Sequence, residues 1–379
     1  MMMEKTLHRE KKYGGGGRID GLDILRSLAA FYVVLNHSIE PPYHLNLEYV
    51  SSMPFRAKIF CFAGFTLGRS GVPIFLLLSG YLLVSREYDA QKTLQFYKNN
   101  LLSLLLTWEI WILIYNLFLM WFNKKPFDIG TYIRNVFFLQ KVDLNHTWYI
   151  PMIIGMYIFL PYAANILHTV STEILLIFMI IVYGYLYIVP SINLFLLADS
   201  LPQLISQLDL SYSGNVYGFY LLLGYCIRRW EIEINKLLKR PVVVLGIVGV
   251  LVCNYLLTIY TQITLYDKQY TYNVWYNYFS MPLIGIAGFL LLKNVQLKIG
   301  KSIITQTSMC SFGIYLLHRP VQMIIIRWIE KIGDKSIEMI VNVVGTYLLT
   351  FCIVWIICRV PHCGKIFFMY KEKPVAYRM

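Results

Sequence analysis

Two ionisable side chains lie within the first long apolar stretch of this sequence, and their spacing places them on one helical face. Arg26 and His37 are separated by ten residues, so in a helix their azimuths agree to within about 20° and they lie about 16 Å apart. Inside a bilayer such groups are costly, and they persist where they are paired or face a wet cavity. The guanidinium could bind an anion, and the imidazole, whose pKa lies near neutrality, could act as a general base.

Each of these two residues also has a structural alternative. Arg26 could reach the inner headgroups with help from Asp23 one turn back, and His37 could cap the outer end of its helix. The shared face favours a functional pair over two independent structural residues, although the pair alone does not identify an enzyme.

The composition of the chain indicates whether these residues lie in a membrane or in a water-soluble domain. Of its 379 residues, 57% are hydrophobic, 16% are aromatic and only 15% are charged, which leaves too little polar surface to cover soluble cores. The net charge of +13 is spread between apolar stretches rather than gathered in one patch, which argues against a nucleic-acid partner. The seven cysteines lack metal-ligand spacing, so neither a disulfide framework nor a metal site is predicted.

Apolar blocks of near-membrane length predict an all-α polytopic bundle of about ten transmembrane helices. When the N-terminus is taken as inside, the inner segments hold about twice as many Lys and Arg residues as the outer segments, which predicts that both termini are cytoplasmic. The predicted spans lie near residues 22–39, 60–84, 100–122, 148–167, 172–192, 214–230, 242–260, 274–292, 308–328 and 337–358.

Three regions are predicted along the chain. Residues 1–18 are polar and basic and contain no cleavable signal peptide, so they are expected to form a flexible cytoplasmic arm. Residues 19–360 are expected to form the transmembrane domain, with the first span as an uncleaved anchor, and residues 361–379 a basic cytoplasmic tail. No soluble domain is inserted, so the activity is expected in or at the membrane.

Four ordered segments resemble one known family. Residues 22–37 resemble the first helix of the acyltransferase 3 family, whose hallmark is Arg, ten residues and then His. Residues 69–83 resemble its second helix, with Val-Pro and Ser-Gly elements in register, and residues 146–152 resemble the start of its fourth span, where an aromatic pair precedes Pro. Residues 311–320 resemble a late-span pattern that ends in His. The resemblance therefore extends over most of the chain.

The resemblance implies the fold, activity and partners of that family. Its members are multi-pass enzymes, typically with ten membrane helices, that O-acylate surface polysaccharides, peptidoglycan and related acceptors. For this chain it implies transfer of an acyl group, expected to be acetyl, from cytoplasmic acyl-CoA as co-substrate to a hydroxyl of a saccharide or lipid-linked glycan. No bound cofactor and no metal are expected. The implied location is the cytoplasmic membrane of a bacterium, and assembly as a homo-oligomer is left open.

The resemblance also implies roles for individual residues. His37 is expected to be the general base for the acceptor hydroxyl, with His318 as a second catalytic or orienting group. Arg26, Arg69 and Ser79 are expected to bind the acyl donor or to stabilise the tetrahedral intermediate.

His146 and Trp148, at the start of the fourth span, are expected to contact the acceptor. An interfacial aromatic belt is the structural alternative for both residues. Hydrogen-bonded burial is the alternative for His318, headgroup anchoring for Arg69, and close helix packing for Ser79.

One departure from the family pattern concerns the donor. Many relatives carry basic residues and a proline at the start of the third span, where this chain has Asn100, Ser103 and Thr107. If those cations hold the diphosphate of CoA, this chain must hold it differently or use another donor. Two rival functions stay open: a transporter of an amino acid or envelope precursor, with residues 71–73 as its helix break, and a noncatalytic partner of polysaccharide assembly.

Overall fold

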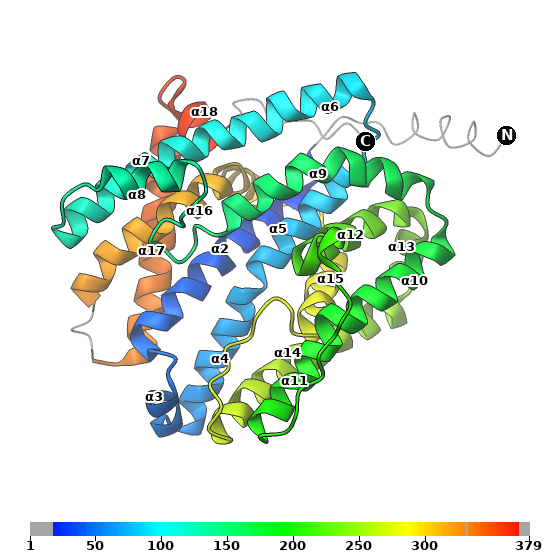
Figure 1. Ribbon diagram of the computed structural model, residues 1–379, viewed down its shortest axis with the longest axis horizontal. Coiled ribbons are helices and arrows are strands. Elements are labelled where there is room, and N and C mark those ends of the chain that lie inside the picture. The colour runs from blue at the N-terminus through cyan, green and yellow to red at the C-terminus, as the bar shows by residue number, and fades with distance from the viewer. Residues whose placement is uncertain (1–17, 330–332, 371–379) are drawn as a thin grey trace.

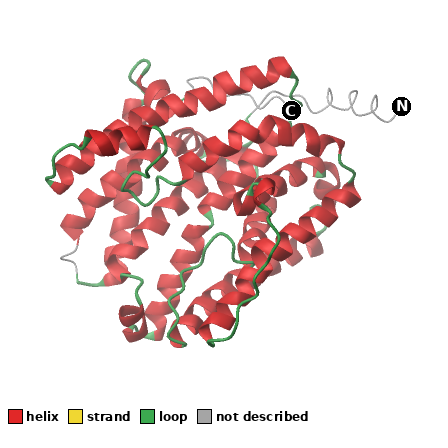
Figure 2. Ribbon diagram, viewed as in Figure 1, coloured by secondary structure: helices red, strands yellow, loops and turns green. Residues whose placement is uncertain are grey.

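The computed structural model describes residues 18–329 and 333–370, and within these ranges every regular element is a helix (Figure 2). The predicted all-α class is therefore confirmed. Residues 1–17 of the predicted arm and residues 371–379 of the predicted tail lie outside the described residues. The helices are α2 (Asp20–Tyr43), α3 (Leu47–Ser52), α4 (Phe55–Arg69), α5 (Gly71–Ser79), η1 (Gly80–Val84), α6 (Ala90–Phe96), η2 (Tyr97–Leu101), α7 (Leu102–Asn123), α8 (Ile129–Val136), α9 (Tyr149–Thr169), α10 (Thr172–Tyr183), η3 (Gly184–Ile188), α11 (Val189–Ala198), η4 (Ser211–Ser213), α12 (Asn215–Arg229), α13 (Glu231–Leu237), α14 (Pro241–Asp267), α15 (Ser280–Leu292), α16 (Lys301–Ile329), α17 (Lys335–Ile357) and α18 (Cys363–Phe368).

Seven helical stretches of the described residues are long and apolar enough to cross a membrane. Three more predicted spans coincide with helices that do not meet this criterion. α12 has 15 residues and α15 has 13, so they rise only about 22 and 20 Å, and α2 contains Asp23, Arg26 and His37. For these three the span remains a prediction, as does the side on which the termini lie. The seven stretches are Phe55–Val84, Ala90–Asn123, Tyr149–Thr169, Thr172–Ala198, Pro241–Asp267, Lys301–Ile329 and Lys335–Ile357.

Helix α2, which carries two of the predicted site residues, lies in the middle of the bundle (Figure 1). It packs against α16 and α17 on one side and against α4, α5 and α15 on the other. Glycines allow the α4–α5 stretch to approach its backbone, because a Cβ on Gly68 would lie 2.6 Å from the amide nitrogen of Asn36. A Cβ on Gly71 would similarly lie 2.8 Å from the carbonyl oxygen of Ala29. The absence of a side chain at these two positions therefore allows α4 and α5 to pack closely on α2.

The predicted helix break at residues 71–73 is much smaller than a transporter mechanism would need. α4 and α5 meet at Ser70, whose backbone stays in the right-handed helical region with φ −73° and ψ −12°. The two helices therefore run on as part of one stretch of 30 residues. A discontinuous helix of the transporter type would instead expose unpaired backbone groups at this point.

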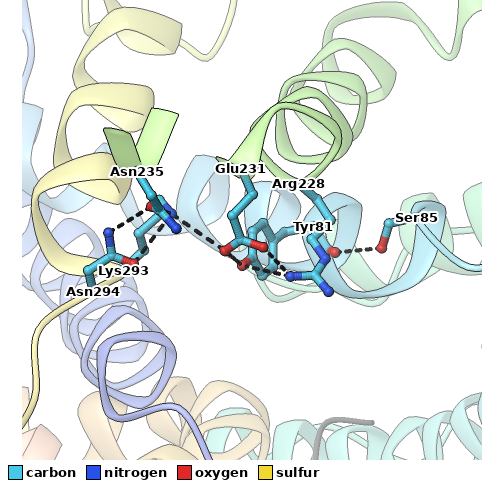
Figure 3. Close-up of polar contacts among 7 residues, drawn as sticks. All are labelled: Tyr81, Ser85, Arg228, Glu231, Asn235, Lys293 and Asn294. Atoms are coloured by element: carbon cyan, nitrogen blue, oxygen red, sulfur yellow. Dashed lines mark hydrogen bonds and ion pairs between the residues drawn. The ribbon is translucent and has the colours of Figure 1, made fainter. Parts of the chain in front are cut away.

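A polar cluster fixes the ends of η1, α12, α13 and α15 (Figure 3). Glu231 forms an ion pair with Arg228 and accepts a hydrogen bond from the Tyr81 hydroxyl. The Lys293 ammonium lies 3.5 Å from the same carboxylate and donates to Asn235 at 2.6 Å, and only 1% of its side chain is exposed. Because a buried cation without partners is strongly destabilising, this cluster ties the four elements together.

Candidate active site

A cavity of about 380 Å³ lies beside the N-terminal half of α2. Its lining contains three arginines, Arg18, Arg26 and Arg86, and no carboxylate from the described residues. The volume is within the range of small-molecule binding sites. A cavity with this lining suits an anionic ligand, because guanidinium groups bind phosphate through paired hydrogen bonds. We refer to it as the arginine cavity.

Asp23 positions two of these three arginines. Its side chain is 1% exposed, forms an ion pair with Arg18 and lies 3.9 Å from the Arg26 guanidinium. Ser308 on α16 donates to the Asp23 carboxylate at 2.8 Å and accepts hydrogen bonds from Arg18 at 3.1 Å and Arg26 at 3.5 Å. Among the described residues, the Asp23 carboxylate thus contacts two of the three arginines.

Three histidines from distant parts of the sequence come together at the other end of this region. The ring centroids of His146 and His318 are 4.8 Å apart, those of His37 and His318 are 5.3 Å apart, and those of His37 and His146 are 6.4 Å apart. His37 lies on α2, His318 on α16, and His146 just before α9. Among the described residues, no group of His, Cys, Asp and Glu side chains has the geometry of a metal site.

The hydrogen bond of His318 fixes its tautomer. Its Nδ1 lies 2.6 Å from the backbone carbonyl of Tyr315, and a carbonyl can only accept, so Nδ1 carries the proton. In the neutral ring the lone pair is therefore on Nε2. This atom is buried and has no hydrogen-bond partner among the described residues. In its neutral form, His318 therefore has an acceptor on Nε2 that no described residue occupies.

A proline in α16 fixes the tautomer of His146 indirectly. Pro320 has no N–H to offer the carbonyl of Leu316, as residue 320 of a regular helix would. The Tyr115 hydroxyl donates to that carbonyl instead, at 2.6 Å. Its single proton is then committed, so its oxygen accepts from Nε2–H of His146 at 3.1 Å. The lone pair of His146 is on Nδ1, which is buried and unpartnered in the described part of the chain.

A second and much smaller cavity, which we call the histidine cavity, lies at this cluster. Its volume is about 10 Å³, about the space of one water molecule. His37, His146 and Trp148 line it, so the predicted base and both predicted acceptor residues share one space. Tyr149 and Tyr315 line it as well, and both of them also line the arginine cavity. The two cavities are therefore neighbours.

The two remaining predicted donor residues lie in different places. Ser79 lines the arginine cavity, and its hydroxyl donates to the Phe75 carbonyl at 2.9 Å. Arg69 lies instead among aromatic rings, with its guanidinium carbon 4.7 Å from the ring of Phe65 and 4.5 Å from that of Trp275. It is only 9% exposed, and its Nε has no partner among the described residues. Burial this deep does not fit anchoring in lipid headgroups.

Sequence reasoning missed several residues of these cavities. Arg18 was assigned to the N-terminal arm, and Arg86 was counted only as a charge between spans. Both line the arginine cavity together with Asn100, which lies in the segment that departs from the family pattern. Tyr149 and Tyr315 lie within two of the segments that resemble the family, but nothing in the sequence assigned a role to either of them.

Comparison with known proteins agrees with the resemblance seen in the sequence. The acyltransferase 3 family model, described as an acyltransferase domain, matches residues 19–359. No curated protein and no solved structure matches the chain. The matched range includes the three histidines and nearly all of the lining of both cavities. The chain therefore belongs to the acyltransferase 3 family and is a multi-pass membrane protein with an acyltransferase domain.

Proposed function

We propose that this protein transfers an acetyl group from cytoplasmic acyl-CoA to a hydroxyl of an envelope saccharide, with His37 as the general base. The observation that supports this proposal is the position of α2 along both cavities. Arg26 lines the arginine cavity, His37 lines the histidine cavity, and the two cavities share walls. A donor held by its phosphates near Arg26 could extend its thioester toward His37, about 16 Å farther along the helix.

The arginine cavity is proposed as the donor site. Arg18, Arg26 and Arg86 would hold the phosphates of CoA. The excess of basic residues in the predicted inner segments favours a cytoplasmic position for this end of α2, and the family resemblance implies a bacterial cytoplasmic membrane. Arg18 and Arg86 offer the positive charge that relatives carry at the start of the third span. The departure at that span is therefore compatible with CoA as donor.

The chemistry at the histidine cluster is a direct acyl transfer. As the acceptor oxygen attacks the thioester carbon, His37 takes the hydroxyl proton, a carbon–oxygen bond forms and the carbon–sulfur bond breaks. The proton then passes from His37 to the departing thiolate, which leaves as the free thiol of CoA. His146 and His318 offer lone pairs, which favour the transient imidazolium of His37.

An aromatic group beside the histidine cavity is proposed to bind the saccharide. The ring of Trp148 lies 5.2 Å from that of Tyr217, 5.5 Å from that of Tyr276 and 6.1 Å from that of Trp275. Such rings provide a flat apolar surface with polar edges for a sugar. Arg69 contacts Trp275, so its predicted part in donor binding would be at the thioester carbonyl rather than at the phosphates.

Transfer of labelled acetyl from acetyl-CoA to pooled envelope glycans by the purified protein in lipid tests this function. His37→Gln is expected to lower the transfer rate at least 100-fold, the typical contribution of a general base. His168→Gln is the matched control, because His168 packs on Tyr225, outside the histidine cluster. Full activity of His37→Gln would move the base to another residue. No transfer by the unsubstituted protein with any donor or acceptor would favour a transporter or an assembly partner.

A further inference from the structure

The arginine and histidine cavities meet at two aromatic rings. Tyr149 and Tyr315 are the residues that line both cavities, and their ring centroids are 5.4 Å apart with an angle of 58° between the rings. If the donor binds in the arginine cavity, its acyl group must pass this pair to reach His37. The pair thus stands on the path that the reaction needs.

The two rings are held to different degrees. The Tyr315 hydroxyl donates to the backbone carbonyl of His146 at 2.5 Å, and its ring stacks on Phe312 with centroids 6.4 Å apart. Tyr149 is the first residue of α9 and is half-buried. Because Tyr315 is only 4% exposed whereas Tyr149 is half-buried, we expect Tyr149 to be the ring that moves aside while Tyr315 stays in place.

The space beyond the pair sets the size of group that can enter. The histidine cavity has only about 10 Å³, against about 380 Å³ on the donor side. Acetyl is the shortest acyl chain with a methyl end, and every added methylene would have to push against closely packed rings, because packed interiors resist such overfilling. A short acyl chain is therefore favoured by the space behind the two rings.

We propose that Tyr149 and Tyr315 act as an acyl-length filter that admits acetyl and rejects longer chains. The inference rests on the proposed function, since it assumes that a thioester approaches from the arginine cavity. The same pair would also restrict water, so that a bound thioester is not hydrolysed when no acceptor is present.

Transfer rates with acetyl-CoA, butyryl-CoA and hexanoyl-CoA test the filter in the purified protein in lipid. Tyr149→Ala is expected to raise the ratio of butyryl to acetyl transfer, as kcat/KM, at least tenfold and to raise acetyl-CoA hydrolysis without acceptor. Tyr149→Phe keeps the ring and should keep the original ratio. Tyr157→Ala removes an aromatic ring that lines the arginine cavity alone, so it should keep the ratio whatever it does to the rate.

The outcomes separate the two proposals. If the unsubstituted protein transfers acetyl but Tyr149→Ala leaves the chain-length ratio unchanged, the filter is overturned and the acyltransferase function stands. If the unsubstituted protein transfers no acyl group to any acceptor, both are overturned. Tyr149→Leu, which removes the ring but keeps apolar bulk, replaces the alanine variant if the latter does not fold, and it should also raise the ratio.

Discussion

Replacement of Tyr115 by phenylalanine removes a single hydroxyl that satisfies two buried groups. That hydroxyl donates to the Leu316 carbonyl, which Pro320 leaves without a helical donor, and accepts from the ring of His146. Hydrogen bonds between membrane helices contribute about 0.6 kcal/mol on average and at most about 1.7 kcal/mol, so loss of both should lower the free energy of unfolding by about 1 to 3 kcal/mol.

The same change should reduce the rate of acyl transfer. Without the Tyr115 oxygen, Nε2–H of His146 loses one of its acceptors, so the ring can more readily carry its proton on Nδ1. This tautomer removes the Nδ1 lone pair of His146, which is one of the two lone pairs that His146 and His318 offer to the histidine cluster. A loss of about 1.4 kcal/mol in the preference for the Nε2–H tautomer lowers the ratio of the two tautomers about tenfold. We therefore expect the transfer rate to fall about tenfold.

A double-mutant cycle with Pro320 isolates this hydrogen-bond network. Pro320→Ala restores a backbone N–H for the Leu316 carbonyl, so in that background Tyr115→Phe should destabilise the protein by only about half as much. Thermal unfolding and initial transfer rates of the four proteins in lipid give the comparison. Equal destabilisation in both backgrounds, or unchanged stability and rate in Tyr115→Phe, would refute the reasoning.

Three further predictions concern donor binding and packing. Arg26→Gln and Arg86→Gln should each weaken acetyl-CoA binding about tenfold, the loss of a charge-assisted phosphate contact of about 1.5 kcal/mol, and calorimetric titration that gives unchanged affinity would contradict this. Glu231→Gln should lower the free energy of unfolding by about 2 to 3 kcal/mol because it leaves the buried Lys293 unpaired; an unchanged unfolding temperature would show that the cluster is not stabilising. Gly80→Ala should destabilise the bundle by about 1 to 3 kcal/mol, since its Cβ would lie 2.0 Å from a backbone oxygen of α12, and a neutral effect in thermal unfolding would exclude that clash.

Local patterns in the sequence predicted the helix that organises the site. The ten-residue spacing of Arg26 and His37 depends only on helical periodicity, and each residue lines one of two adjoining cavities. The histidine cluster could not be predicted in this way. His146 and His318 reach His37 through tertiary packing across more than a hundred residues of sequence, and the family resemblance pointed to them without giving their distances.

The apolar composition of the segment before α15 predicted a helix that starts too early, because side chains of other helices satisfy the backbone of this segment. Residues 274–279 are apolar or aromatic except for Asn277 and were predicted as the start of a span, yet α15 begins only at Ser280. The Val274 amide donates to Gln262 at 3.0 Å, and the Tyr220 hydroxyl donates to the Tyr276 carbonyl at 2.7 Å. Because side chains from α14 and α12 satisfy this backbone, the segment need not be helical.

Arginines between spans were equally hard to interpret from sequence. Arg18 and Arg86 fit the topology count and gave no sign that they face a cavity, since the same residue type serves both purposes. Only the packing of α2, η1 and α16 brings them to one wall beside Arg26. In the proposed donor site, they would supply the positive charge that is missing at the start of the third span.

The most direct test of the account measures donor binding and acyl transfer on the same three proteins: the unsubstituted chain, His37→Gln and Arg26→Gln. The account predicts that His37→Gln binds acetyl-CoA with unchanged affinity but transfers at least 100-fold more slowly, whereas Arg26→Gln binds the donor more weakly. The account places donor binding at Arg26 and base catalysis at His37. It would be contradicted if His37→Gln transferred at the original rate, or if His37→Gln lost donor binding while Arg26→Gln kept it.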